Sequence, residues 1–252
     1  MLRYLRTICV EVFDEAESAA TARGSTFKAA VVCVTAALCL TMAFYLGTPA
    51  MMRTLMGAGD GWMQKLWWAG AVIVFYLLLP VVVVKWGLRE QLGDFGLVMK
   101  FPAKDLPLYF GMLGVVLVLV AVFSGTEAFQ ARYPFFKPAA GESLWPRFWI
   151  WEAVYLLQFV AVEFFFRGFL LHGLRRRMGF MAVFVSMMPY CLVHFGKPLP
   201  ETLGAILAGI VLGILSLKSR SIMPGVLLHA GVALGMDLAV LWRSGLGGLA
   251  SS

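Results

Sequence analysis

Long apolar stretches separated by short polar connections dominate the pattern along the chain. Seven of them approach the roughly 20 residues that a helix needs to cross a bilayer. They lie near 29–47, 65–85, 106–126, 148–171, 180–196, 202–217 and 222–242. The fifth and sixth are short, which is typical of a tilted or broken helix. Because only helices and closed barrels satisfy their backbone in lipid, the pattern predicts an all-α, polytopic transmembrane bundle of about seven helices.

The first 28 residues follow a different pattern, in which apolar side chains recur at helical spacing between charged ones. The apolar positions are Leu2, Leu5, Ile8, Cys9, Val12 and Phe13. This predicts an amphipathic helix on the membrane surface and not a cleavable signal, whose apolar core would end in small residues. We therefore expect three parts: an interfacial segment 1–28, N-terminal transmembrane helices 29–147 and a C-terminal helical core 148–242.

Composition agrees with the membrane class and excludes a water-soluble domain. The 252 residues are 61% hydrophobic and 14% charged, with a mean hydropathy of +0.84, so too little polar material exists to cover a surface in water. The net charge of +7 would suggest nucleic acid in a soluble protein. Here the basic residues lie between apolar stretches and fit lipid headgroups, so no nucleic-acid partner is expected.

Lysine and arginine counts predict the orientation. With a cytoplasmic N-terminus and seven crossings, 13 basic residues lie inside and 7 outside, which agrees with the positive-inside rule. The short loops favour a bacterial inner membrane. The four cysteines are scattered and form no metal-site or disulfide pattern.

Ionisable residues inside the apolar stretches are the candidates for function, because a charge at the bilayer centre costs at least ~2.5 kcal/mol. They are Glu163, Arg167, His194, His229 and, nearer an end, Asp237; Glu152 lies close to the edge of its stretch. Helical rise places Glu163, His194 and His229 in one layer, each from a different helix. Glu163 and Arg167 are four residues apart and can form an ion pair. The pair either neutralises itself and specifies packing, or Arg167 holds a carboxylate that acts on water. The two histidines at similar depth favour a functional site.

Three motifs occur in order: Glu163-Phe-Phe-Phe-Arg167-Gly, Tyr190-x-x-x-His194, and Ser-Ile running to His229. Over about residues 148–240 the chain thereby resembles the CPBP family, which contains CAAX proteases and bacteriocin-processing enzymes described as glutamic intramembrane proteases. The resemblance implies an intramembrane endopeptidase that acts on a membrane-anchored protein or peptide. CAAX tails, leader peptides and C-terminal sorting tails are all open as substrates.

The chain departs from the family pattern at three positions. Val162 stands where the family has its first glutamate, which together with the second-motif histidine is credited with activating water. Ala233 stands where an Asn or Asp follows the third-motif histidine, and Tyr190 replaces Phe, a mild change. A myxosortase-like bacterial branch that works with one glutamate is one explanation of the first departure.

The resulting hypothesis is hydrolysis by a water that a carboxylate and an imidazole polarise. Glu163 is the expected general base, His194 its partner on the same water and His229 the oxyanion donor, with Arg167 orienting Glu163. Asp237, two turns beyond His229, is a weaker candidate for the missing Asn or Asp. No cofactor is expected.

Two other readings remain open at this point. A zinc protease could use Glu163, His194 and His229 as ligands, although the chain has no H-E-x-x-H motif and Arg167 would repel a metal. An inactive family member could instead be a membrane scaffold or regulator, with Val162 and Ala233 marking lost catalysis. Proton-coupled transport is a weaker alternative, since no inverted repeat is evident.

Overall fold

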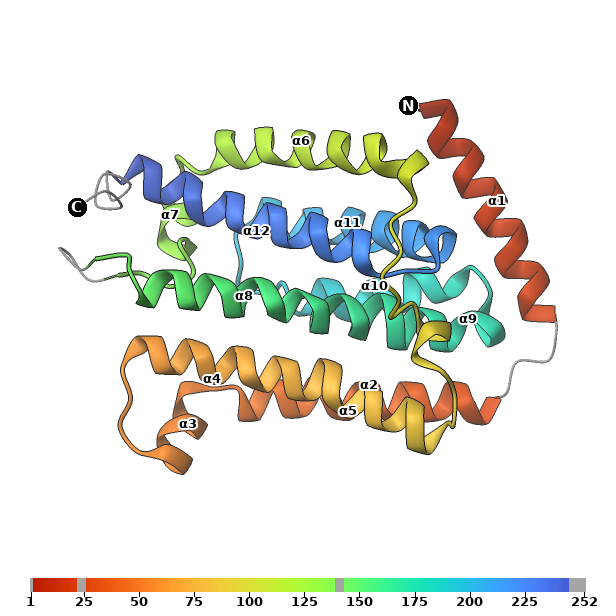
Figure 1. Ribbon diagram of the computed structural model, residues 1–252, viewed down its shortest axis with the longest axis horizontal. Coiled ribbons are helices and arrows are strands. Elements are labelled where there is room, and N and C mark those ends of the chain that lie inside the picture. The colour runs from red at the N-terminus through yellow and green to blue at the C-terminus, as the bar shows by residue number, and fades with distance from the viewer. Residues whose placement is uncertain (1, 22–25, 139–142, 245–252) are drawn as a thin grey trace.

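A computed structural model describes residues 2–21, 26–138 and 143–244, and these ranges are helical with no strand. Six helices in them are long and apolar enough to cross a membrane, and a shorter apolar helix, α10 (Met181–Leu192), makes a seventh (Figure 1). The six spans are Thr26–Leu46, Gly61–Gly87, Ala103–Phe123, Arg147–Met178, Leu199–Ser219 and Met223–Arg243. The predicted all-α bundle of about seven helices is confirmed, and the chain is an integral, multi-pass membrane protein.

Several spans are built from consecutive helical elements. The first and the last two are single helices, α2 (Thr26–Leu46), α11 (Leu199–Ser219) and α12 (Met223–Arg243). The second span joins α4 (Gly61–Ile73), η1 (Val74–Leu78), α5 (Leu79–Val82) and η2 (Val83–Gly87). The third joins η4 (Ala103–Asp105) to α6 (Leu106–Phe123), and the fourth joins α8 (Arg147–Glu163), η5 (Phe164–His172) and α9 (Gly173–Met178). Three short elements lie outside the spans: α3 (Pro49–Met56), η3 (Leu92–Phe95) and α7 (Glu127–Arg132).

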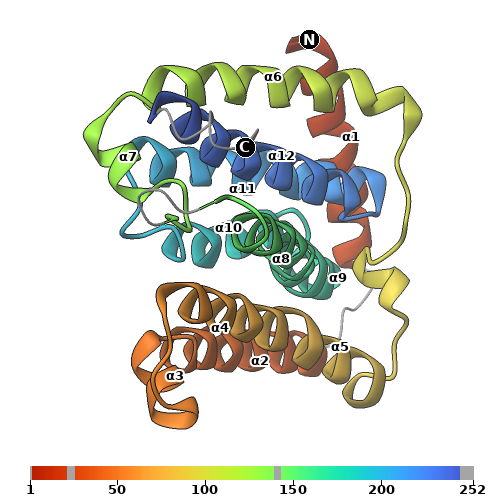
Figure 2. The same ribbon diagram turned by 60° about the vertical axis from the view of Figure 1, so that its left-hand side comes forward.

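The N-terminal helix α1 (Leu2–Thr21) lies across one end of the bundle, at a steep angle to the other helices (Figures 1 and 2). Ile8 and Val12 are buried where α1 packs against α9 and α11, and Glu15 forms a 2.6 Å ion pair with Arg220. The predicted helix is therefore present, and Ile8 and Val12 of its apolar face cover the bundle, whereas Cys9 and Phe13 are exposed. The side chains of Leu2 and Leu5 fall outside the described part.

The fourth span is the central helix of the bundle. In its most apolar window 72% of the residues are buried, against 17–50% in the other five spans. Four phenylalanines of η5 are fully inaccessible: Phe164, Phe165, Phe166 and Phe169. Tyr76 of η1 stacks on Phe165 with ring centroids 4.4 Å apart. Because close packing surrounds this helix, the polar side chains that it carries are held in fixed positions.

The segment around η3 folds back against η5 and the turn before α12. The backbone N–H of Ile222 donates to the carbonyl oxygen of Gly96 at 2.9 Å, and the Ser221 hydroxyl donates to that of Val98 at 2.9 Å. Gly168 permits this approach, because a Cβ there would lie 2.8 Å from the Phe95 carbonyl oxygen. These contacts fix the start of α12 relative to η5, and so the two elements that border the candidate site.

Candidate active site

Glu163 ends α8, where the α-helix passes into the π-helical segment η5. Its side chain is fully buried, and Oε1 lies 3.1 Å from Nη1 of Arg167. Oε2 has no hydrogen-bond partner among the described residues and lies against Gly225 of α12, where a Cβ would be only 2.6 Å away. Glycine at this position therefore lets α12 approach the carboxylate.

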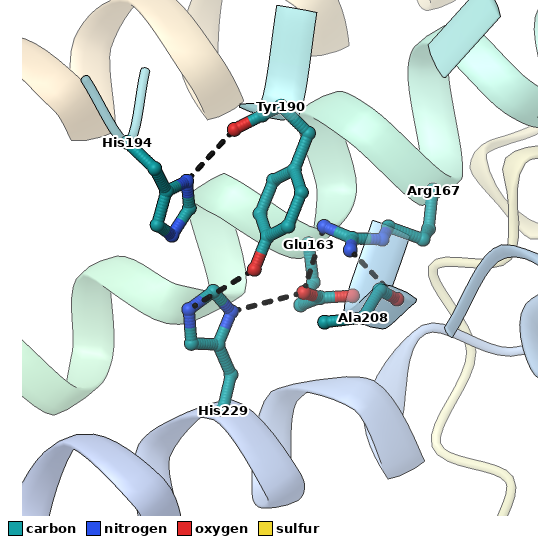
Figure 3. A network of polar contacts seen from close by, with 6 residues as sticks. All are labelled: Glu163, Arg167, Tyr190, His194, Ala208 and His229. Carbon is teal, nitrogen blue, oxygen red and sulfur yellow. Dashed lines mark hydrogen bonds and ion pairs between the residues drawn. The ribbon is translucent and has the colours of Figure 1, made fainter. Parts of the chain in front are cut away.

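Arg167 connects three helices through one buried guanidinium group (Figure 3). Besides the ion pair with Glu163, its Nη2 donates to the carbonyl oxygen of Ala208 on α11 at 3.5 Å. Its Cζ lies 3.8 Å from the centroid of the Tyr190 ring on α10. A charge buried this deeply has to be compensated, and Glu163 together with the face of the ring supplies that compensation.

His229 of α12 contacts the same carboxylate oxygen, with Nδ1 3.1 Å from Oε1 of Glu163. Its ring also stacks on Phe159 of α8, with centroids 4.3 Å apart. Since an ionised carboxylate can only accept, Nδ1 carries the hydrogen, and Nε2 of the neutral ring is an acceptor. Nε2 lies 3.5 Å from the Tyr190 hydroxyl. The acid thus fixes both the orientation and the tautomer of this imidazole.

His194 lies in the turn after α10 and not within a helix as expected. Its Nδ1 is 2.7 Å from the carbonyl oxygen of Tyr190, so this ring also carries its hydrogen on Nδ1 and presents Nε2 as an acceptor. The Thr202 hydroxyl of α11 donates to the His194 carbonyl oxygen at 3.0 Å. Side chains thereby satisfy part of the irregular backbone, which is tolerated at membrane depth where it lines a cavity.

A cavity of about 810 Å³ lies among α6, α7, α8, α10, α11 and α12. Tyr190, His194 and His229 line it, whereas Glu163 and Arg167 are not among the described residues of its wall. The wall is otherwise mainly apolar, with side chains such as Leu113 and Val211. The carboxylate therefore lies behind His229, and the imidazole separates it from the cavity.

One end of the cavity is polar. The Tyr133 hydroxyl donates to Oε2 of Glu201 at 2.7 Å, and Nζ of Lys197 donates to Oε1 at 2.6 Å. Burial, together with the nearby Glu201 carboxylate, raises the pKa of Tyr133, so its hydroxyl remains a donor. Lys197 follows His194 in the same turn, so this polar end adjoins the imidazole.

The structure brings the three predicted site residues into one network (Figure 3). Glu163 and His229 are in direct contact, and His194 joins them through Tyr190, whose carbonyl oxygen and hydroxyl contact the two imidazoles. The arrangement differs from the sequence hypothesis in one respect, because Glu163 was expected to face the water itself. Beside the carboxylate, the cavity wall offers two imidazole acceptors and the Tyr190 phenol, whereas the polar end lies beyond His194.

Asp237 lies apart from this network. Its Oδ1 accepts a hydrogen bond of 3.0 Å from the backbone N–H of Phe135, and its carboxyl group interacts electrostatically with that of Glu152. Both acids are buried. Oδ2 of Asp237 and both carboxyl oxygens of Glu152 have no hydrogen-bond partner among the described residues. Two carboxylates buried close together repel each other unless a proton is bound between them. Asp237 therefore belongs to a second link between α8 and α12, two turns from His229.

Sequence reasoning missed two polar groups. The Tyr190 hydroxyl was treated as a mild change, although its spacing of four residues before His194 places both near one helix face. His172, at the end of η5, is buried with Nε2 3.1 Å from the Ser216 hydroxyl of α11. It comes at the end of an apolar stretch beside three arginines, and no motif marks it.

The described residues offer no set of ligands for the zinc alternative. Within residues 2–21, 26–138 and 143–244, no three His, Cys, Asp or Glu side chains are grouped closely enough to hold a metal ion. Oε1 of Glu163 already contacts Arg167 and His229. The donor geometry therefore favours chemistry by the side chains themselves.

Comparison with known families bears on the C-terminal half of the chain. Residues 143–235 match the family model described as type II CAAX prenyl endopeptidase Rce1-like. Neither the curated proteins nor the solved structures gave a match. The matched segment contains Glu163, Arg167, Tyr190, His194 and His229, and it does not single out the myxosortase-like branch. Over residues 143–235 this chain is therefore similar to the Rce1-like type II CAAX prenyl endopeptidases, which agrees with the CPBP family that its motifs resemble.

Proposed function

We propose that this protein is an intramembrane endopeptidase that hydrolyses a peptide bond of a membrane-associated protein or peptide. The observation that carries the proposal is the pairing of Glu163 with Nδ1 of His229, while the same imidazole borders a cavity of about 810 Å³. An acid behind an imidazole is the arrangement by which hydrolases make histidine an oriented general base. Its position in the Rce1-like segment agrees with this activity.

In the proposed reaction a water in the cavity is the nucleophile. Nε2 of His229 takes one proton from the water, and the oxygen attacks the scissile carbonyl carbon as the carbonyl π electrons move to its oxygen. Glu163 stabilises the imidazolium that forms, and Arg167 keeps the carboxylate in place. His229 then returns the proton to the amide nitrogen, the C–N bond breaks, and the second hydrogen of the water passes from the new carboxylic acid to the amine, so that a carboxylate and an ammonium group are released.

His194 orients the same water in this proposal. With its hydrogen on Nδ1, His194 offers Nε2 as an acceptor for the second hydrogen of the water. The water then donates to two imidazoles, which directs a lone pair of its oxygen toward the substrate. This modifies the hypothesis based on sequence, because the imidazole of His229 becomes the base and Glu163 acts through it. Val162 therefore does not remove the general base.

The experiment that tests the proposal compares wild type with Glu163→Gln in liposomes that contain candidate membrane proteins, with new termini identified by mass spectrometry. Glu152→Gln is the matched control, because it makes the same change on the same helix outside the network. Termini that appear with wild type and Glu152→Gln but not with Glu163→Gln support the proposal. Equal products from all three variants, or none from wild type, contradict it; the latter favours the scaffold alternative.

A chelator arm separates the zinc alternative. Cleavage by wild type that survives treatment with a strong chelator agrees with the proposed imidazole chemistry. Loss of cleavage that zinc restores would contradict it and would assign the site to a metalloprotease.

A further inference from the structure

Tyr190 places a hydroxyl group at the reacting side of the cavity. Its Oη lies 3.5 Å from Nε2 of His229, and the residue lines the cavity with His194. The ring is held on three sides, by the Arg167 guanidinium at 3.8 Å, by Phe166 at 5.3 Å between ring centroids and by His194 at 4.6 Å. The hydroxyl is therefore fixed in position, although its hydrogen can rotate about the C–O bond.

The site needs a hydrogen-bond donor that the two imidazoles do not supply at the start of the reaction. Both carry their hydrogen on Nδ1, where Glu163 and the Tyr190 carbonyl oxygen accept it, so both present acceptors to the cavity. Attack on a carbonyl places negative charge on its oxygen, which a positioned donor has to stabilise. Ala233, one turn beyond His229 on the cavity wall, offers only a methyl group.

We infer that Tyr190 is a further catalytic residue, whose hydroxyl donates a hydrogen bond to the carbonyl oxygen of the substrate in the transition state. The inference rests on the endopeptidase function proposed above and names an additional group for that reaction. It also gives a physical meaning to tyrosine at this position, where the family that the chain resembles carries phenylalanine.

Proton transfer to His229 switches the role of the hydroxyl. Before the reaction the Tyr190 O–H donates to Nε2 of His229, over a long contact that a water or substrate can displace. Once Nε2 has taken the proton of the attacking water, it becomes a donor, and the phenol oxygen can accept from it. The phenol hydrogen is then free to turn toward the oxyanion, so the donor becomes available as the charge develops. No bond in Tyr190 is broken.

Arg167 strengthens this donor. Its guanidinium lies over the ring of Tyr190 and pairs with Glu163, so one cation contacts both the phenol and the acid behind the base. A cation over an aromatic face draws electron density from the ring and makes the attached hydroxyl a stronger hydrogen-bond donor. Arg167 would thus act on both sides of the same step, through Glu163 on the base and through Tyr190 on the donor to the oxyanion.

The test is the substitution Tyr190→Phe, which removes one oxygen and keeps the ring that Arg167, Phe166 and His194 contact. We expect kcat to fall by about 10²- to 10³-fold, the usual effect of losing one oxyanion donor, with KM little changed because the bond forms only in the transition state. Tyr76→Phe is the control, because it removes a buried phenol oxygen outside the cavity. Its turnover should equal that of wild type.

The possible outcomes separate this inference from the function on which it rests. Turnover by Tyr190→Phe within threefold of wild type, or a raised KM with unchanged kcat, overturns the role of Tyr190 and leaves the endopeptidase proposal standing. Absence of hydrolysis by wild type overturns both.

A measurement without turnover tests the contact itself. In protein labelled with ¹⁵N-histidine, the Nε2 resonance of His229 should shift toward that of an unbonded acceptor in Tyr190→Phe, but not in Tyr76→Phe. The resonance is assigned by its loss in His229→Gln. An unchanged Nε2 resonance would show that the hydroxyl does not bond the imidazole, and it would overturn the inference.

Discussion

The same two helices, α8 and α12, are linked by polar side chains at two places, and the two links differ in chemistry. Glu163 and His229 join an acid to a base, with Arg167 as a counter-charge. The second link pairs two acids, Glu152, about 16 Å from Glu163 along α8, and Asp237, which accepts a hydrogen bond from the backbone N–H of Phe135. The first link borders a cavity through its imidazole, whereas the second is enclosed by aromatic side chains such as Trp151.

In the function proposed above, the first link can move a proton to a substrate, whereas the second link holds two helices together. At the first link the imidazole presents Nε2 on the side of the cavity, where its contact with the Tyr190 hydroxyl is long, so in the proposed reaction a proton can arrive there and leave. At the second link neither Glu152 nor Asp237 is among the described residues that line the cavity, and the hydrogen bond from Phe135 ties α12 to the connection before α8. Burial alone therefore does not distinguish a reacting group from a structural one. The distinguishing feature is whether the side chain also borders the cavity.

The largest expected effect is on turnover at the first link. Glu163→Gln should lower kcat by about 10³- to 10⁴-fold, because an amide can donate to Nδ1 of His229 and so reverse its tautomer. The same substitution at the second link, Glu152→Gln, should leave kcat within a few-fold of wild type, since an amide can donate a hydrogen bond to Asp237 and Glu152 does not line the cavity. Peptide cleavage in liposomes measures both. Similar losses in the two variants would remove the distinction between the links.

A smaller effect on turnover is expected from Gly225→Ala. The added methyl group would lie 2.6 Å from Oε2 of Glu163, so the carboxylate has to move relative to His229. A displacement near 1 Å costs about 10²-fold in rate. Gly70→Ala on α4 is the control, because a Cβ there meets no atom within 4 Å. Unchanged kcat in Gly225→Ala would mean that the position of the carboxylate is not critical.

At the second link we expect loss of stability instead of turnover. Asp237→Ala leaves the Phe135 N–H and the Glu152 carboxyl without their partner, and an unsatisfied buried group costs about 1–3 kcal/mol. Asp237→Asn should cost less, because its amide oxygen still accepts from Phe135. Thermal unfolding in detergent measures the loss, and turnover of the folded fraction should remain near that of wild type. A specific loss of turnover in Asp237→Asn would place Asp237 in the chemistry.

The smallest effect is expected at an exposed pair that provides a reference for both buried links. Asp60 caps the start of α4 through the N–H of Met63 at 2.9 Å and pairs with Arg147 at 2.6 Å. The hydrogen bond from Met63, helped by Arg147, lowers the pKa of Asp60. Its contribution to stability is therefore present at neutral pH and lost as the pH falls through the lowered pKa.

Asp60→Ala should accordingly lower the unfolding temperature slightly at neutral pH and not at all in acid, where both proteins lack the charge. Unfolding temperatures measured across this pH range check the prediction. A difference that persists in strong acid would assign the effect to helix packing and not to the carboxylate.

The sequence predicted the bundle well because bilayer thickness imposes a length on every span. The predicted stretches 65–85 and 222–242 differ from the observed spans Gly61–Gly87 and Met223–Arg243 by a few residues. The stretch 180–196 was too long at its end, since α10 stops at Leu192. Pro189 lies in that last turn, and the following turn carries His194, where a cavity replaces the lipid that would otherwise require a helix.

The sequence predicted which residues come together at the candidate site, but not which of their atoms face the cavity. Periodicity and depth identified Glu163, His194 and His229 as one group, because ionisable residues are rare in apolar helices. Which oxygen or nitrogen meets the cavity depends on helix rotation, on the close approach at Gly225 and on the π-helical turns after Glu163. The partner of Asp237 was equally hidden, because Phe135 lies 102 residues away in a connection without a pattern.

The helix that crosses the end of the bundle has a consequence for the molecules that can reach the site. α1 packs against α9, which carries Arg175, and Glu163 lies 12 residues before Arg175 along the central helix, a rise of about 18 Å. If this basic end lies at the headgroup level, as the sequence pattern predicts, an extended substrate of the proposed endopeptidase covers about 3.4 Å per residue and needs about five residues to reach from there to His229. Peptides too short or too folded to span that interval would then not be cleaved.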